Sequence, residues 1–323
     1  IHELGILRDF PDRTETDLYL WAANHRAELE EELGWSITTA AALSDLASTK
    51  SSTPARVAKR VGRWLHDILL PDAIEPGPRA GIWREELTSN QQTSLFPSIL
   101  VPISESDHDW QALQQAVKIA KREGSTIHGL YVLPQKIHSE TAVERLQSEF
   151  LRHLQEARVE GQFGVEEGSI ARTICERSRW DNLVVLHAAH PPADTPRDRL
   201  SSGLRMMIHR CPRPILVVPF KATPIEHVLL AYNDSPKAQE ALFVAAHFSG
   251  SWKSKLTVIS VAEKRSLGYE WLDQAREYLE SHGVKAGYHH KLGSVARTID
   301  HSASQYRCDL ILIGGYKAAP LTE

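Results

Sequence analysis

One seven-residue segment occurs twice in the chain with a single substitution. Residues 168–174 read GSIARTI and residues 293–299 read GSVARTI, so the two copies differ only at Ile170 and Val295. In each copy the glycine is typical of the end of one element, and the serine that follows is typical of a helix N-cap. A duplication of this kind predicts two copies of one structural unit, which constrains the fold more than any other feature.

The likeness between the copies extends on both sides of the duplicated segment. Each copy holds short apolar runs of the buried-strand type, separated by helical patterns: residues 98–104, 126–132 and 183–186 in the first copy, and residues 227–233, 255–261 and 310–313 in the second. Because strand and helix alternate, the pattern predicts parallel sheets with right-handed crossovers.

A further apolar run at residues 214–219 closes the first copy and has no counterpart in the second. We therefore expect an α/β fold with two tandem, open, parallel five-stranded sheets that carry helices on both faces. The second sheet is expected to be truncated at its C-terminal end. The expected domains span residues 96–220 and 224–323.

Residues 1–95 are expected to form a mainly α-helical N-terminal segment followed by a linker. The helical patterns and their caps predict three helices, which run from Thr14 or Thr16 to Gly34, over residues 39–47, and from Thr53 to the residue before Pro71. Residues 71–95 are rich in proline, glycine and small polar residues and are predicted to be the linker.

The third predicted helix has a basic side, formed by Arg56, Lys59, Arg60 and Arg63. Such a side either contacts nucleic acid or an acidic partner, or is the solvated face of an amphipathic helix. The whole chain has 37 Lys and Arg residues against 41 Asp and Glu residues, a net charge of −4. This balance favours the solvated face and speaks against nucleic acid as a partner.

The composition also bears on the compartment of the protein. No apolar run approaches the roughly 18 residues of a membrane span, so no membrane association is expected. Cys175, Cys211 and Cys308 are an odd and sparse set, which argues against a disulfide framework and indicates a reducing, cytoplasmic location. The chain begins at Ile1 and ends at Glu323, from which we expect a fragment that lacks an upstream domain.

Taken together, the motifs resemble the universal stress protein family in its tandem form. The resemblance covers about two thirds of the chain. It rests on the polar tips of the first strands, the two Gly-Ser-x-Ala helix starts, the apolar strands entered from Asp181-Asn182 or Asp309, and the CPRPILVV ending at residues 211–218. The resemblance implies a regulatory, non-enzymatic stress-response role. It also implies pairing through the last strand, so that the two domains form a pseudo-dimer within the chain; a homodimer is a further option.

Part of that family binds ATP beyond the carboxyl ends of its strands, using an aspartate at the tip of the first strand and a glycine-rich loop around the phosphates. In the first copy the resemblance places Ser104, His187 and His190 at these positions, so ordinary phosphate binding is not expected there. In the second copy it implies an adenine-nucleotide site formed by Asn233, Asp234, Ser235, Val261, Gly314, Gly315 and Lys317.

Other kinds of site find little support in the residues. The sequence contains no Walker-type loop, no Gly-x-Ser-x-Gly elbow and no other catalytic constellation, so an enzyme is not expected. His187 and His190 have the spacing for a shared metal ion, but no third ligand is placed by the sequence, so no metal is expected. The alternative function is a protein-interaction scaffold without ligand, in which both nucleotide sites are degenerate.

Overall fold

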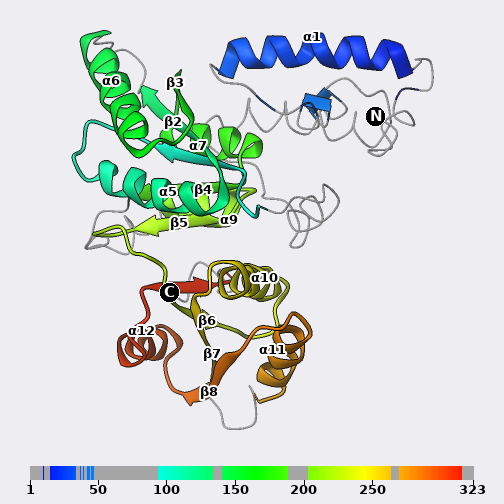
Figure 1. The fold of residues 1–323 in the computed structure, drawn as a ribbon, viewed down its shortest axis with the longest axis vertical. Coiled ribbons are helices and arrows are strands. Elements are labelled where there is room, and N and C mark those ends of the chain that lie inside the picture. The colour runs from blue at the N-terminus through cyan, green and yellow to red at the C-terminus, as the bar shows by residue number, and fades with distance from the viewer. Residues whose placement is uncertain are drawn as a thin grey trace.

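Two parallel sheets with flanking helices form most of the computed structural model (Figure 1). The structure describes residues 10, 15–33, 37, 39, 42–43, 45–46, 94–133, 140–187, 203–262 and 269–314. We call the part around the five-stranded sheet the first α/β unit, residues 98–218, and the part around the four-stranded sheet the second α/β unit, residues 227–313. The α/β fold class predicted from the alternating pattern is confirmed.

The first sheet has the strand order β3-β2-β1-β4-β5, and every neighbouring pair is parallel. Its strands are β1 (Ser98–Pro102), β2 (Thr126–Leu133), β3 (Gly161–Glu167), β4 (Leu183–His187) and β5 (Ile215–Val218). Its helices are α5 (Asp109–Glu123), α6 (Glu140–Ala157), α7 (Ile170–Arg177), the 3-10 turn η2 (Ser178–Trp180) and α9 (Gly203–Arg210).

The second sheet has the order β8-β7-β6-β9, again with parallel neighbours. Its strands are β6 (His227–Ala231), β7 (Lys255–Ala262), β8 (Ala286–Leu292) and β9 (Leu310–Ile313), and its helices are α10 (Pro236–Ser251), α11 (Tyr269–Ser281) and α12 (Val295–Gln305). The order corresponds to that of the first four strands of the other sheet. At the open edge, Ile311 and Ile313 of β9 are 40% and 53% exposed.

Apolar side chains cover both faces of the first sheet, as a parallel sheet between two helical layers requires. Successive residues of a strand point to opposite faces, and β1 shows this clearly. Ile99 and Val101 pack in the cluster that holds Leu113 of α5, whereas Leu100 packs in the cluster that holds Ile174 of α7. The three β1 side chains have no exposed surface, so the centre of the sheet is rigidly held beneath its loops.

The duplicated segment has the same backbone form in both units. Gly168 and Gly293 have φ angles of 156° and 139°, a region that favours glycine. A Cβ atom on either glycine would lie 2.7 Å or 3.1 Å from the hydroxyl oxygen of the threonine five residues later. Ser169 and Ser294 take the N-cap positions of α7 and α12 but make no side-chain cap hydrogen bond. The glycine is therefore required by backbone geometry, and the serines occupy the predicted N-cap positions without the side-chain hydrogen bond of a cap.

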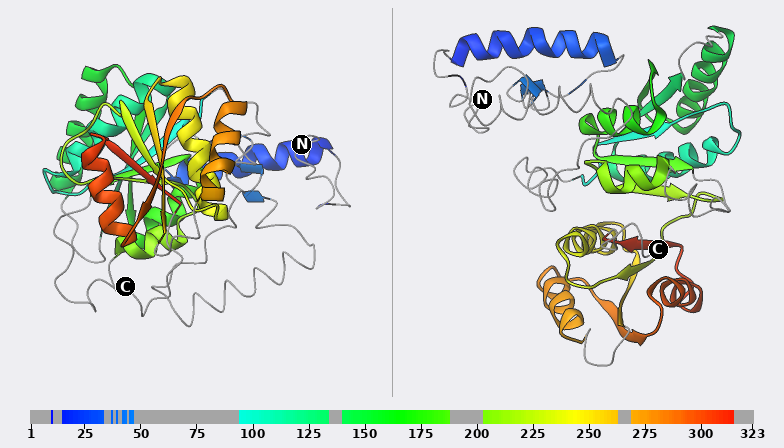
Figure 2. Two further views of the ribbon diagram at one scale, coloured as in Figure 1. Left: turned by 90° about the horizontal axis from the view of Figure 1, so that it is seen from below. Right: turned by 180° about the vertical axis from the view of Figure 1, so that it is seen from behind.

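Helix α1 (Glu15–Leu33) lies beside the first α/β unit and away from the second (Figure 2). Its bounds agree with the first predicted helix. Leu29 of α1 and the nearby Ile37 pack in the cluster that contains α7, so the N-terminal segment covers that face of the first unit. The described residues between 39 and 46 are helical, as predicted. The predicted third helix with its basic side, and nearly all of the linker, lie outside the described residues.

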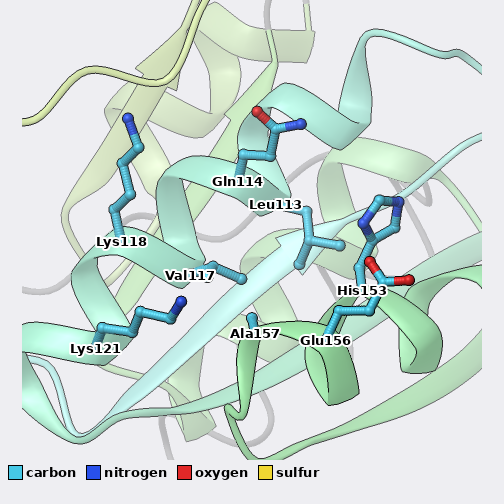
Figure 3. Close-up of a pocket in the computed structure, with 8 residues that line it drawn as sticks. All are labelled: Leu113, Gln114, Val117, Lys118, Lys121, His153, Glu156 and Ala157. Atoms are coloured by element: carbon cyan, nitrogen blue, oxygen red, sulfur yellow. The ribbon is translucent and has the colours of Figure 1, made fainter.

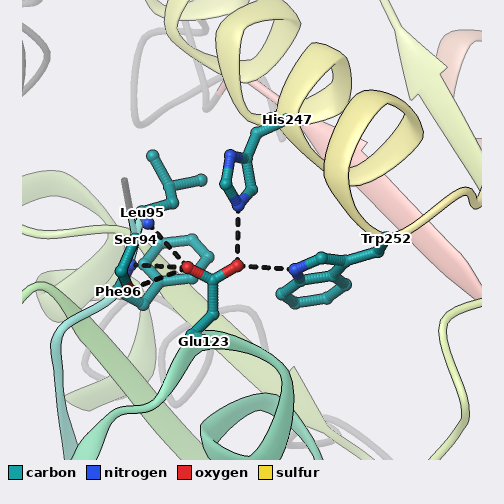
Figure 4. A network of polar contacts seen from close by, with 6 residues as sticks. All are labelled: Ser94, Leu95, Phe96, Glu123, His247 and Trp252. Atoms are coloured by element: carbon teal, nitrogen blue, oxygen red, sulfur yellow. Dashed lines mark hydrogen bonds and ion pairs between the residues drawn. The ribbon is translucent and has the colours of Figure 1, made fainter. Parts of the chain in front are cut away.

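The two α/β units contact each other through α5 and α10 (Figure 4). Glu123, at the end of α5, points one carboxylate oxygen at the second unit, where His247 Nε2 and Trp252 Nε1 donate to it at 2.6 Å and 2.5 Å. The other oxygen accepts bonds from Ser94 Oγ at 2.9 Å and from the Leu95 backbone N–H at 2.6 Å. The Glu123 side chain is only 3% exposed, so a buried carboxylate accepts the hydrogen bonds that link the two units.

Burial by itself raises the pKa of the Glu123 carboxyl, because the charged form loses hydration. The hydrogen bond and the charge of His247, helped by bonds from Ser94 and Trp252, outweigh burial and lower the pKa to about 2. The carboxylate is therefore ionised at neutral pH. Aromatic packing surrounds it, since the rings of Phe248 and Trp252 stack with centroids 4.1 Å apart.

The segment that joins the units is also held by α5. Gln115 accepts a 2.7 Å hydrogen bond from the Thr223 backbone N–H, and Lys118 Nζ donates to the Ala222 carbonyl at 2.9 Å. The Thr223 hydroxyl in turn donates to the carbonyl of Asp309, directly before β9. Helix α5 of the first unit thus contacts both α10 and the segment that joins the units, and that segment contacts the residue before β9.

Candidate functional site

The loop after β6 occupies the switch point of the second sheet. β6 pairs with β7 on one side and with β9 on the other, so the direction of the strand order reverses at β6. In open parallel sheets, ligands bind outside the carboxyl ends of the strands at such a point. Tyr232 to Ser235 lie here and lead directly into α10.

Asn233 and Ser235 form a compact turn that starts α10. The Asn233 carbonyl oxygen Oδ1 accepts a bond from the Ser235 backbone N–H at 3.2 Å and another from Ser235 Oγ at 2.8 Å. Ser235 Oγ accepts a 3.3 Å bond from the Ala238 N–H and so caps the helix, with Pro236 at the first helical position. Asn233 is exposed, and its amide nitrogen has no hydrogen-bond partner among the described residues.

Asp234 is held by side chains of its own unit. Its φ angle is 53°, a left-handed conformation that aspartate tolerates better than most residues. Its Oδ1 accepts bonds from Tyr232 Oη at 2.9 Å and Gln239 Nε2 at 3.2 Å. The hydrogen-bond network assigns the Gln274 amide nitrogen toward the same carboxylate, at 2.8 Å and 2.7 Å. Burial, and then the bond to Asp234, raise the pKa of Tyr232.

Gly314 follows β9 and lies against the start of α10. A Cβ atom at this position would be 2.3 Å from the Ala238 backbone nitrogen and 2.5 Å from the Lys237 carbonyl carbon. Neither backbone atom can move without shifting the helix, so only glycine fits between β9 and α10. The parallel pairing of β6 with β9 therefore brings Gly314 beside the Asn233–Ser235 turn.

Val261 lies one strand away at the same edge of the sheet. It follows Ile259 by two residues, as Asn233 follows Ala231, and Ala231 and Ile259 are paired in register. Its half-buried side chain packs in the small cluster beneath the edge. The other two predicted site residues, Gly315 and Lys317, lie outside the described residues.

The corresponding point of the first unit is built differently. Ser104 donates from its backbone N–H and from Oγ to the same oxygen of Asp109, at 2.8 Å and 2.5 Å. His187, at the end of β4, holds the place that Gly314 holds in the other unit. Its ring stacks on His108, with centroids 5.1 Å apart and planes 18° apart, and bonds the Val218 carbonyl at 2.9 Å. Two imidazole rings therefore fill the space beside the start of α5.

Sequence reasoning missed several residues that shape these two sites. His108 and Asp109 come from the start of α5, and Gln274 comes from α11. A signal was present only for Asp109, because an acidic residue in the first turn of a helix is a common start signal. His190, which the sequence paired with His187, lies outside the described residues, and no described group of three His, Cys, Asp or Glu side chains could hold a metal ion.

A groove lies between α5 and α6 (Figure 3). It is lined by Leu113, Gln114, Val117, Lys118, Lys121, His153, Glu156 and Ala157. The groove lies over the helical layer rather than at the carboxyl ends of the strands, and Lys118 is engaged with the Ala222 carbonyl. It therefore lacks the backbone donors that a phosphate group needs.

A search of curated proteins finds no match to the sequence. The family model of the universal stress proteins matches residues 96–219. Among solved structures, a universal stress protein from Archaeoglobus fulgidus is similar with 17% identity and a TM-score of 0.58, over 71% of this chain and 89% of that one. A structure titled putative universal stress protein from Pseudomonas aeruginosa is 20% identical with a TM-score of 0.52, over 70% and 85%.

These likenesses extend over more of the chain than the family model does, and at such identities they establish the fold alone. Among the described residues, no helix combines the length and the apolar character needed to cross a bilayer. The five-stranded order of the first sheet and the match to the family model agree on the same segment. The segment of residues 96–219 is therefore a universal stress protein domain.

Proposed function

We propose that the protein is a non-enzymatic regulator of the stress response that binds an adenine nucleotide at the switch point of its second α/β unit. The observation that supports this most is the contrast between the two units. In the first unit, the stacked rings of His108 and His187 fill the space at the corresponding switch point. In the second unit the same place is held by Gly314, which leaves backbone rather than side chain beside the start of α10.

The groups around this point suit a nucleotide. The exposed amide nitrogen of Asn233 can donate to a ribose hydroxyl or an adenine ring nitrogen. The first turn of α10 offers a partial positive charge and the Lys237 N–H to phosphate oxygens, since Pro236 has no N–H and Ser235 takes the Ala238 N–H. Val261 would contact the apolar face of the base. Gly315 and Lys317 would continue the phosphate loop, with the lysine as a point charge.

A ligand-free interaction scaffold is the second candidate, and one observation favours it. Asp234 already accepts bonds from Tyr232, Gln239 and Gln274, and the Asn233 oxygen is taken by Ser235. Most acceptors at this strand tip are therefore satisfied within the chain, which is what a degenerate site would look like.

We further propose that residues 1–95 form a helical segment, that residues 96–220 and 224–323 are tandem domains, and that the two domains pair as a pseudo-dimer in the cytoplasm. The buried Glu123 network supports the pairing, since a carboxylate bonded from both units fixes their relative position. The absence of a catalytic constellation in the sequence supports a role without turnover.

Isothermal titration of the chain with Mg-ATP tests the nucleotide proposal. Asn233→Ala should weaken binding by about tenfold, because it removes one donor to the ligand. Ser104→Ala, the equivalent change in the first unit, is the matched control and should leave the affinity unchanged. A folded sample that takes up no Mg-ATP, or an affinity that responds to Ser104→Ala instead, would reject this site and favour the scaffold.

A further inference from the structure

Two of the three cysteines meet in the first α/β unit although they are far apart in the sequence. Cys175 lies on α7, and Cys211 follows directly after α9, which packs on α7. Both side chains belong to the apolar cluster beneath that face of the sheet. Ser178, which ends α7 as its C-cap, contacts both cysteines, through the Cys175 carbonyl and the Cys211 sulfur. The two cysteines therefore lie together in one cluster of the folded chain, with both thiols reduced.

Ser178 fixes the geometry of this pair. Its hydroxyl donates to the Cys175 backbone carbonyl at 2.8 Å and lies 3.1 Å from Cys211 Sγ. The serine side chain has no exposed surface, so this bridge is held rigidly. The side chain of Arg213, two residues after Cys211, donates to the carbonyls of Asp181 and Arg179 at 2.7 Å and 3.1 Å.

The two sulfur atoms differ in access and in acidity. Cys211 is partly exposed, whereas Cys175 is only 3% exposed. The neighbouring Cys175 thiol, together with the backbone N–H and the charge of Arg213, outweighs burial and lowers the pKa of Cys211. The neighbouring Cys211, and then burial, raise the pKa of Cys175. A partly exposed cysteine with a lowered pKa, next to a buried one, is the arrangement of an attacking and a resolving cysteine.

We propose that Cys175 and Cys211 are a reversible disulfide site that hydrogen peroxide oxidises. The Cys211 thiolate attacks one peroxide oxygen and the O–O bond breaks, which gives a sulfenic acid on Cys211 and a hydroxide that is protonated to water. The Cys175 sulfur then attacks the sulfenic sulfur as its own proton leaves. The S–S bond forms, the S–O bond breaks, and the departing hydroxide takes up a proton as a second water. Two thiols lose two electrons, and one peroxide becomes two waters.

The bond would join α7 to the segment that enters β5. The same apolar cluster holds Leu29 and Ile37 from the N-terminal segment, so the oxidised pair lies directly beneath the surface on which that segment packs. This site is independent of the switch point in the second unit and of any nucleotide.

Peptide mapping under non-reducing conditions tests the proposal, in the full chain with Cys308→Ser so that only the pair remains. After treatment with hydrogen peroxide and blocking of free thiols, the peptides of Cys175 and Cys211 should be linked, and dithiothreitol should release them. In the Cys175→Ser variant, dimedone should trap a sulfenic acid on Cys211. Unlinked peptides from a protein with an unchanged circular dichroism spectrum, or a link that forms only after denaturation, would overturn the proposal.

Alkylation rates provide a second readout in the unmodified chain. Cys308 has a pKa raised by burial and by the nearby Asp309 charge to about 11, and it serves as the internal reference. At pH 7, iodoacetamide should modify Cys211 at least roughly tenfold faster than Cys308, because thiolate is the reactive form. Equal rates would mean that Cys211 is not an activated thiol and would also overturn the proposal.

Discussion

The buried carboxylate of Glu123 should contribute a large and pH-dependent share of the stability. Every group that points at it is a donor: His247, Trp252, the Ser94 hydroxyl, and the backbone N–H groups of Leu95 and Phe96. A glutamine would have to direct its NH2 group at one of these two sets of donors. Glu123→Gln therefore removes bonds on one side and adds a donor–donor contact there.

The magnitude follows from the pKa of the carboxyl group. Its value falls from 4.5 to about 2 on folding, and each unit corresponds to about 1.4 kcal/mol, so the ionised form stabilises the fold by about 3 kcal/mol at pH 7. Because the folded pKa is the lower one, this stability is fully present above pH 4.5 and is lost as the pH falls toward 2. Linkage leaves about 1.4 kcal/mol of it at pH 3.

Urea unfolding, followed by circular dichroism at pH 7 and pH 3, measures this effect. Glu123→Gln should lower the free energy of unfolding by about 3 kcal/mol at pH 7 and by about half as much at pH 3. Glu144→Gln, on the exposed side of α6, is the matched control and should have little effect at either pH. A loss that does not change between the two pH values, or one equal to that of the control, would refute the reasoning.

Three further substitutions test the second unit by thermal or urea unfolding. Gly314→Ala should destabilise it by about 2–3 kcal/mol, because the Cβ atom would press on the Ala238 backbone. Gly287→Ala is the control and should cost less than about 1 kcal/mol, because the nearest neighbour of its Cβ atom would be 3.5 Å away. Equal losses of stability in the two variants would contradict the close packing at Gly314. Ser235→Ala should cost about 1 kcal/mol through the lost cap of α10, so an unchanged melting curve would argue against that cap. Asp309→Ala should cost about 1–3 kcal/mol, because its carboxylate accepts two backbone N–H groups at the start of β6, and a neutral result would show that water replaces it.

The parts of the fold that the sequence predicts are those set by local patterns. Alternating apolar runs and helical patterns give parallel strands, and the duplicated segment gives the matching glycines Gly168 and Gly293. The serines that follow them show the limit of such patterns, because the N-cap position is taken without the expected side-chain bond. A serine at the N-cap position is able to form a capping hydrogen bond, and the surrounding backbone determines whether the bond forms.

Contacts between distant segments had no signal in the sequence. Glu123 meets His247 and Trp252 from 124 and 129 residues away, and nothing in the pattern of α5 distinguishes this glutamate from an exposed one. The candidate site shows both situations. Asn233 and Ser235 interact locally and were identified as neighbours, whereas the bond between Asp234 and Gln274 depends on how α11 packs.

The two switch points show how one architecture can carry two different surfaces. In the first sheet β4 lies beside β1, and in the second sheet β9 lies beside β6. The last residue of β4 therefore lies near the start of α5, and the residue that follows β9 lies near the start of α10. At Gly314 the backbone lies against α10, and any side chain would displace the helix. At His187 the side chain turns onto His108 and fills the space. The difference therefore arises from single positions at the ends of equivalent strands, while the sheet beneath them is the same.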